Sequence, residues 1–207
     1  MSQVFNPWKD YDPAHDIGPQ APKIRRSNLE RYLQARVGRV KLLLTGEASG
    51  YQGCHFSGIA MTSERILLGG KSGIPADSVF AGLKERTSKP EIYPLGANEP
   101  TASIAWSLLL SLGIAPDEFI FWNSFPTHPY QAGDLLTNRT PKPQELARAA
   151  HILPAMLSLT AGAQVVAVGH VAQKALSALG VRAKGVRHPA MGGATIFRAQ
   201  MGELLAV

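Results

Sequence analysis

Three side chains able to support hydrolytic chemistry come directly after apolar segments of this sequence: Glu47, Asn123 and His188. A carboxylate, an amide and an imidazole can together orient water, read the hydrogen-bonding edge of a ring and stabilise an anion. Taken singly, each is better explained as a solvated or turn residue. Their common placement after apolar segments instead favours a functional site.

The elements that must position these groups alternate between apolar strands and helices. The predicted strands are uniformly apolar and cover about 40–45, 118–122, 163–169 and 183–186. The predicted helices cover 28–37, 100–112, 141–159, 170–179 and 195–205, with a break or kink at Pro154. This alternation predicts a three-layer α/β/α sandwich around a mainly parallel four-stranded sheet. In such a sheet the strands end at one edge, where ligands bind, so the three polar groups should meet there.

The length of 207 residues suits a single domain, 1–207, in which residues 1–27 form an extended N-terminal arm. Asn28 is the predicted cap of the first helix. The net charge of +6 makes a polyanion such as nucleic acid a plausible partner. The single cysteine excludes an internal disulfide and fits a reducing compartment. Without a secretory signal or a membrane-spanning run, the sequence predicts a cytoplasmic protein that does not bind a membrane. We also expect a monomer.

Several other patterns carry no chemistry. Cys54 and His55 are adjacent, and successive side chains usually diverge, so they are not predicted to act as a nucleophile and base. The glycines around residues 46–53 match neither the dinucleotide fingerprint nor the phosphate loop. The six histidines show no metal-binding spacing. We therefore predict no metal and no cofactor.

Four short motifs, in order, resemble those of the uracil-DNA glycosylase superfamily. They are Gly46-Glu-Ala-Ser-Gly50, Trp122-Asn123, Asn138-Arg-Thr-Pro141 and Val186-Arg-His-Pro189. The likeness spans about residues 40–200 and is nearest to bacterial members whose first motif is Gly-Glu-Ala-Pro-Gly, without iron–sulphur cysteines. It implies base excision repair: a deaminated base such as uracil is flipped out of DNA, and its N-glycosidic bond is hydrolysed.

The resemblance assigns roles to residues at the strand ends. Glu47 would position water or stabilise the sugar cation, and His188 would donate to the oxygen of the departing base. Asn123 would read the base edge with its amide. The remaining residues of the base pocket would be Gly46, Ala48, Met61 and Phe56. Contacts to DNA would come from Gly50, Tyr51, Gly53, Arg139, Arg187, Gly192 and Gly193, with Met191 as the wedge that enters the duplex.

Departures from the family pattern point to reduced activity. Ser49 replaces the usual proline, which predicts a less rigid turn, and Ala48 replaces the water-activating aspartate of the best-known branch. Met61 stands in place of the stacking aromatic, so either Phe56 takes over that role or stacking is lost. Base–aromatic stacking is worth about 1–3 kcal/mol per base. Ala190 replaces the serine that usually follows the His-Pro pair.

Two alternatives to an active glycosylase stay open. One is a weak or inactive member of the same fold that binds DNA or a nucleobase. The other is an unrelated small-molecule enzyme of flavodoxin-like topology, which the lack of a phosphate-loop fingerprint disfavours.

Overall fold

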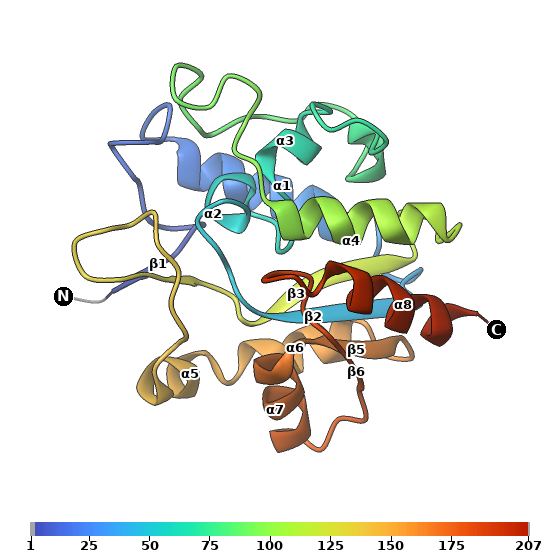
Figure 1. Ribbon diagram of the computed structural model, residues 1–207. Coiled ribbons are helices and arrows are strands. Elements are labelled where there is room, and N and C mark those ends of the chain that lie inside the picture. Colours follow the sequence, from blue (N-terminus) through green and yellow to red (C-terminus); the bar gives the residue numbers. More distant parts are fainter. Residues whose placement is uncertain (1–2, 207) are drawn as a thin grey trace.

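A four-stranded parallel sheet forms the centre of the computed structural model, which describes residues 3–206 (Figure 1). Its strands are β2 (Leu42–Ala48), β3 (Phe119–Phe125), β5 (Gln164–Val168) and β6 (Lys184–Val186), in the order β3-β2-β5-β6. All three pairings are parallel, as the apolar runs predict. After β2 the chain forms β3 on one side of β2, and it then crosses to the other side of β2 to form β5. The ends of β2 and β5 therefore form the switch point at which such sheets bind ligands.

Helices cover both faces of the sheet. α4 (Pro100–Ser111), the last helix before β3, lies on the upper face in Figure 1, where α1 (Ala21–Gln34) also lies. On the lower face lie α5 (Pro143–Ala149), α6 (Ile152–Leu159) and α7 (His170–Ala178). The last helix, α8 (Ala194–Leu205), packs on β6. Fully buried Trp106, Phe119 and Phe121 fill the core between α4 and the sheet.

The N-terminal segment differs from the prediction, because α1 begins at Ala21 and the extended arm ends before it. Pro22 lies in the first turn, where a missing N–H costs nothing. Asn28 is not a cap: it is buried inside the helix and donates to the carbonyls of Ser57 (3.2 Å) and Glu85 (3.3 Å).

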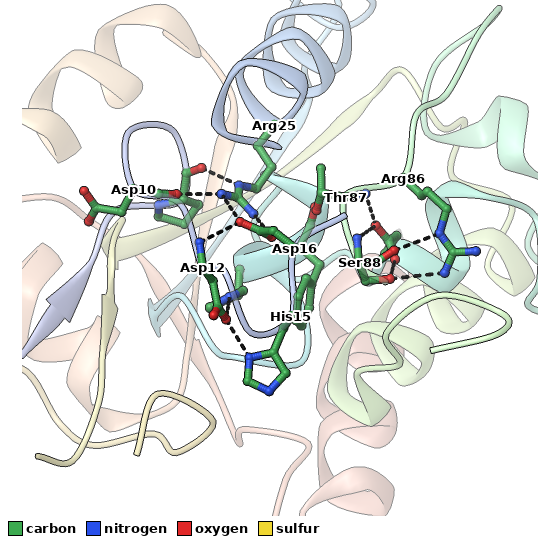
Figure 2. Close-up of polar contacts among 12 residues, drawn as sticks. Asp10, Asp12, His15, Asp16, Arg25, Arg86, Thr87 and Ser88 are labelled. Carbon is green, nitrogen blue, oxygen red and sulfur yellow. Dashed lines mark hydrogen bonds and ion pairs between the residues drawn. The ribbon is translucent and has the colours of Figure 1, made fainter. Parts of the chain in front are cut away.

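Polar contacts fasten the arm to the body of the protein (Figure 2). Fully buried Arg25 pairs with Asp16 at 2.7 Å and also donates to the carbonyls of Pro7 and Asp10. The two-residue strand β1 (Val4–Phe5) pairs with β4 (His128–Pro129). The arm is therefore ordered by side chains that make specific bonds, which an apolar pattern does not reveal.

The predicted helix over 141–159 is two helices. α5 ends at Ala149 and α6 begins at Ile152, so the break precedes Pro154. Pro154 lies in the first turn of α6, where proline is tolerated because its absent N–H has no partner there.

The irregular sequence after β2 holds the short helices α2 (Cys54–Ser57) and α3 (Glu64–Leu67) and the 3₁₀ turn η1 (Ala76–Ser78). Buried Glu64 links this region to residues 87–88, because it accepts hydrogen bonds from the backbone N–H groups of Thr87 and Ser88. Thr87 and Ser88 are labelled in Figure 2. None of the helices within residues 3–206 is long and apolar enough to cross a membrane.

Candidate functional site

The end of β2 places Glu47 at the carboxyl edge of the sheet. Glu47 lies within the last residues of the strand, between Gly46, which is opposite Asn123, and Ala48, which is opposite Phe125. Its side chain is partly buried and lines two adjoining cavities. No residue of the described chain forms a hydrogen bond or an ion pair with this carboxylate. Glu47 is therefore available to a ligand.

Gly46 is where Asn123 and Met61 come together. A Cβ at Gly46 would lie 2.8 Å from the amide group of Asn123 and 3.4 Å from the sulfur of Met61. With its amide assigned to satisfy both neighbours, Asn123 donates to the Trp122 carbonyl (3.1 Å) and accepts from the Ser49 N–H (3.3 Å). Met61 is buried and has a φ of 46°, which is unusual for a residue with a side chain. Only glycine at position 46 leaves room for both side chains.

Ser49 holds the turn after β2 against the end of β3. Its hydroxyl donates to the Pro126 carbonyl, and its N–H lies 3.3 Å from the Phe125 carbonyl. Proline, the residue expected here from the resemblance, can form neither bond. The replacement therefore exchanges the stiffness of a proline ring for two bonds, one to the last residue of β3 and one to the residue after it, which hold the turn in place.

Asn138 holds the other side of this turn. Its amide oxygen accepts a hydrogen bond from the N–H of Tyr51 at 3.1 Å, and its amide packs on Gly50, where a Cβ would lie 3.5 Å away. Asn138 belongs to the third motif in the sequence, but sequence reasoning assigned it no role in the site. Its structural role is to fix the backbone at Gly50 and Tyr51.

His188 follows β6 and packs on two glycines. A Cβ at Gly193 would lie 2.1 Å from the His188 carbonyl, and one at Gly169 would lie 3.2 Å from its Cβ. The Nδ1 atom accepts a hydrogen bond from the Ala190 N–H at 3.1 Å, so the proton of the neutral ring is on Nε2. Burial, and then the nearby Arg187 charge, lower the pKa of His188 below its usual value of 6.5. His188 is therefore a neutral donor at physiological pH.

Glu47 and His188 line the same two cavities. The larger, of about 690 Å³, lies between the turn after β2, the start of α4, residues 138–140 and the segment 188–191. The smaller, of about 280 Å³, is bounded by the ends of β2 and β5 and the start of α7. Both have room for a planar base, and they meet at the switch point of the sheet.

The structure separates some predicted pocket residues from the open cavities. Phe56 is buried and packs with His55 and Tyr93, at ring-centroid distances of 4.5 and 5.0 Å. Asn123, Met61 and Gly46 lie together behind Ser49 and do not line either open cavity. Ala48 lines the larger cavity directly.

Some of the residues predicted to contact DNA already form bonds within the protein, and others do not. Arg139 lines the larger cavity, but its guanidinium pairs with Glu145 through two bonds of 2.7 and 2.8 Å. Gly53 is buried and its N–H donates to the Gly50 carbonyl. Arg187 is exposed and makes no ion pair with the described chain. Two of the predicted phosphate contacts are therefore already committed to the protein itself, and Arg187 is the one available cation among them.

Met191 projects from the rim of both cavities. Its side chain is 95% exposed and its φ is 52°. The adjoining Gly192 is exposed, whereas Gly193 is buried as the N-cap of α8. An exposed apolar side chain on left-handed backbone is costly in a free protein.

Glu99 is a second carboxyl group in the larger cavity, and sequence reasoning missed it. Its Oε2 atom is shielded from solvent and has no hydrogen-bond partner in the structure. A Cβ at Gly53 would overlap this oxygen, so the carboxyl group packs directly on the glycine. Burial raises the pKa of Glu99 to about 7. The only signal in the sequence is its position just before Pro100, at the start of α4.

Cys54 and His55 are both buried, and neither lines the two cavities at Glu47. Burial raises the pKa of the Cys54 thiol to about 12. Burial lowers the pKa of His55 to about 4, although Asp12 lies 3.4 Å from its Nε2 atom. His55 stacks on Phe5 and lies 3.3 Å from His128, whose Nε2 faces the Thr137 carbonyl at 2.7 Å. This buried histidine pair joins the N-terminal arm to the segment that carries Asn138.

Comparisons with known proteins define the fold. No protein-family model and no curated protein matches the chain. Among solved structures, the chain is similar to wild-type SMUG2 of Pedobacter heparinus, with a TM-score of 0.61 and 15% sequence identity. The match covers 98% of this chain and 85% of that chain. This likeness confirms the predicted α/β fold with a parallel four-stranded central sheet.

Proposed function

We propose that this protein is a DNA glycosylase that hydrolyses the N-glycosidic bond of uracil or a related deaminated base in DNA. One observation carries the proposal: the unpaired carboxylate of Glu47 and a neutral His188 face the same cavities. The fold shared with SMUG2 supports it at the level of a DNA glycosylase. The preference for uracil or a related deaminated base rests on the order of the four sequence motifs.

In the proposed reaction the bond breaks toward a cationic sugar and an anionic base. The Nε2–H of His188 donates to the base oxygen on which negative charge develops, as a preorganised donor does for an oxyanion. The neutral imidazole can act as this donor because it carries a proton on Nε2 at neutral pH. It does not have to be protonated to the imidazolium first. The carboxylate of Glu47 stabilises the sugar cation or orients the attacking water, and the water completes the hydrolysis.

Recognition of the base is assigned to Asn123, with Gly46, Ala48 and Met61 around it. An amide offers both a donor and an acceptor, which distinguishes uracil from cytosine. Because the Asn123 amide is engaged by Ser49 and Trp122, base binding requires exchange of these partners. Phe56 packs into the interior, and Met61 is buried as well and lines neither open cavity. Stacking by Met61 therefore requires the same local rearrangement that exposes the Asn123 amide.

DNA is the proposed partner, and the reaction requires no cofactor or metal. The flipped nucleotide enters beside Gly50 and Tyr51, with Arg187 near its phosphates and Met191 inserted into the duplex. We assign the protein to base excision repair in the cytoplasm, acting as a monomer.

The test is release of free base from single- and double-stranded oligonucleotides that contain uracil, hypoxanthine or xanthine. Uracil release is expected, with Glu47→Gln and His188→Ala each slower by about 10²-fold or more. The absence of any release at stoichiometric protein would contradict the proposal.

A second candidate is a DNA-binding member of the fold with little catalysis. The engaged amide of Asn123, set back from the open cavities, favours it. In that case DNA binding should depend on salt, no base should be released, and Glu47→Ala and His188→Ala should leave affinity unchanged.

A further inference from the structure

All of the protein's net charge comes from one part of the chain. Residues 146–202 contain no Asp or Glu, and the cations there are Arg148, Lys174, Arg182, Lys184, Arg187 and Arg198. The remaining Lys and Arg residues are equal in number to the 15 Asp and Glu residues. This segment runs from the end of α5 to α8, so it includes the lower helix α7 and the edge strand β6.

A groove of about 1000 Å³ lies beside α7 in this segment. Its floor is formed by small and apolar residues of β5 and the approach to β6, including Val165, Ala167 and Ala183. Its rim carries exposed Lys174, Arg182 and Lys184. None of these three cations forms an ion pair with residues 3–206. In Figure 1, α7 lies below the sheet with β6 at the sheet edge beside it.

The groove adjoins the candidate active site through His170. This exposed first residue of α7 lines both the groove and the smaller cavity, which Glu47 and His188 also line. Exposed Arg187 lines the smaller cavity as well. A cationic surface therefore extends from the predicted reaction site along α7 to Lys184.

We propose that this groove binds the phosphodiester backbone of the DNA strand that flanks the reacting nucleotide. The proposal rests on the proposed function, because the strand is the one that enters the site. Exposed cations that have no ion-pair partner gain the most binding free energy from contact with a polyanion. When they contact DNA phosphates, the counterions of the DNA are released. The groove has no Phe, Trp or Tyr among its described lining residues, which fits backbone contact without base stacking. A second copy of the chain would bring the same positive charge and be repelled.

The first test compares two triple variants with equal loss of charge. The groove variant combines K174Q, R182Q and K184Q. The control combines K9Q, K23Q and R26Q, which change exposed cations outside the cavities. Affinity for a labelled uracil-containing duplex is measured from 50 to 200 mM salt, where each lost phosphate contact lowers the salt slope by about 0.9. For the groove variant, the slope of log affinity against log salt concentration should be smaller in magnitude by about 2–3, and DNA binding should be about tenfold weaker. The control variant should match the wild type in both.

The second test locates the DNA directly. Cys54 is buried, so a thiol introduced by Ser177→Cys in the groove, or by Ser111→Cys at the exposed last residue of α4 as control, can be labelled alone with a photo-crosslinker. Crosslinks to one flank of the uracil are expected from position 177 and none from position 111. Equal crosslinking from both positions would overturn the proposal.

The outcomes separate this proposal from the activity. If the wild type releases uracil but the groove variant binds like the control, the groove proposal fails alone. If no base is released but the groove variant still loses salt-dependent binding, the groove stands and the glycosylase assignment fails. If poly-glutamate competes as well as DNA of equal charge, the groove is a general anion surface, and the proposed DNA occupant is overturned.

Discussion

Gly46 of β2 lies directly opposite Asn123 of β3, and the space that a Cβ would fill at Gly46 is taken by the Asn123 amide. The glycine thus sets the position of the group assigned to base reading. Strand pairing and the missing side chain act together, since the register brings the residues opposite and the glycine lets the amide lie over the strand.

Gly46→Ala should therefore damage recognition more than folding. The added methyl group would lie 2.8 Å from the amide and must displace Asn123 or Met61, at a cost of about 1–3 kcal/mol. Uracil release should fall at least tenfold, measured as kcat/KM, while chemical denaturation still shows a cooperative transition. Gly202→Ala is the matched control, because nothing lies within 4 Å of its added Cβ. That change in α8 should raise stability by up to about 1 kcal/mol and leave release unchanged. Equal kinetics for the two variants would contradict the role of Gly46.

Much of the fold could be predicted because the central strands are uniformly apolar and end in distinctive polar groups. Glu47 and His188 were identified for that reason, and they do line one site. The start of α1 was missed because Arg25 and Asn28 are buried through specific polar bonds, so the first half of the helix has no apolar stripe. Glu99 was missed because its raised pKa comes from burial, which a sequence does not display.

The pH dependence of base release should identify the active form of His188. Its pKa is lowered below 6.5, so the ring is neutral above that pH, with its proton on Nε2. The rate should stay level from pH 6.5 to 8 and fall only at lower pH, where the ring becomes protonated. Single-turnover rates are best measured in a Glu99→Gln background, which removes the second titrating group of the cavity. A rate that declines steeply between pH 6.5 and 8 would mean that the charged imidazolium is the active form.

Glu99→Gln should stabilise the protein, and more so at high pH. The folded-state pKa of about 7 lies above the ordinary value of 4.5, so the folded state binds more protons between these values. The wild type therefore loses stability as pH rises through this window, and the amide removes that loss. The gain in unfolding free energy should grow by about 2 kcal/mol from pH 5 to pH 8. Denaturant titrations at both pH values measure it, with Glu203→Gln at an exposed position of α8 as the control. A gain independent of pH would show that Glu99 is not a buried acid.

Met191→Gly should separate stability from action on duplex DNA. The residue has a φ of 52° and is 95% exposed, so glycine relieves backbone strain and removes almost no packing. The melting temperature should not fall. A wedge matters only where a base leaves a stack, and unstacking costs a few kcal/mol. Uracil release from duplex should therefore drop about tenfold or more, with little change on single strands. Ile196→Ala, half-exposed on neighbouring α8, is the control and should affect neither substrate. Equal losses on the two substrates would show that Met191 shapes the base pocket and does not act as a wedge.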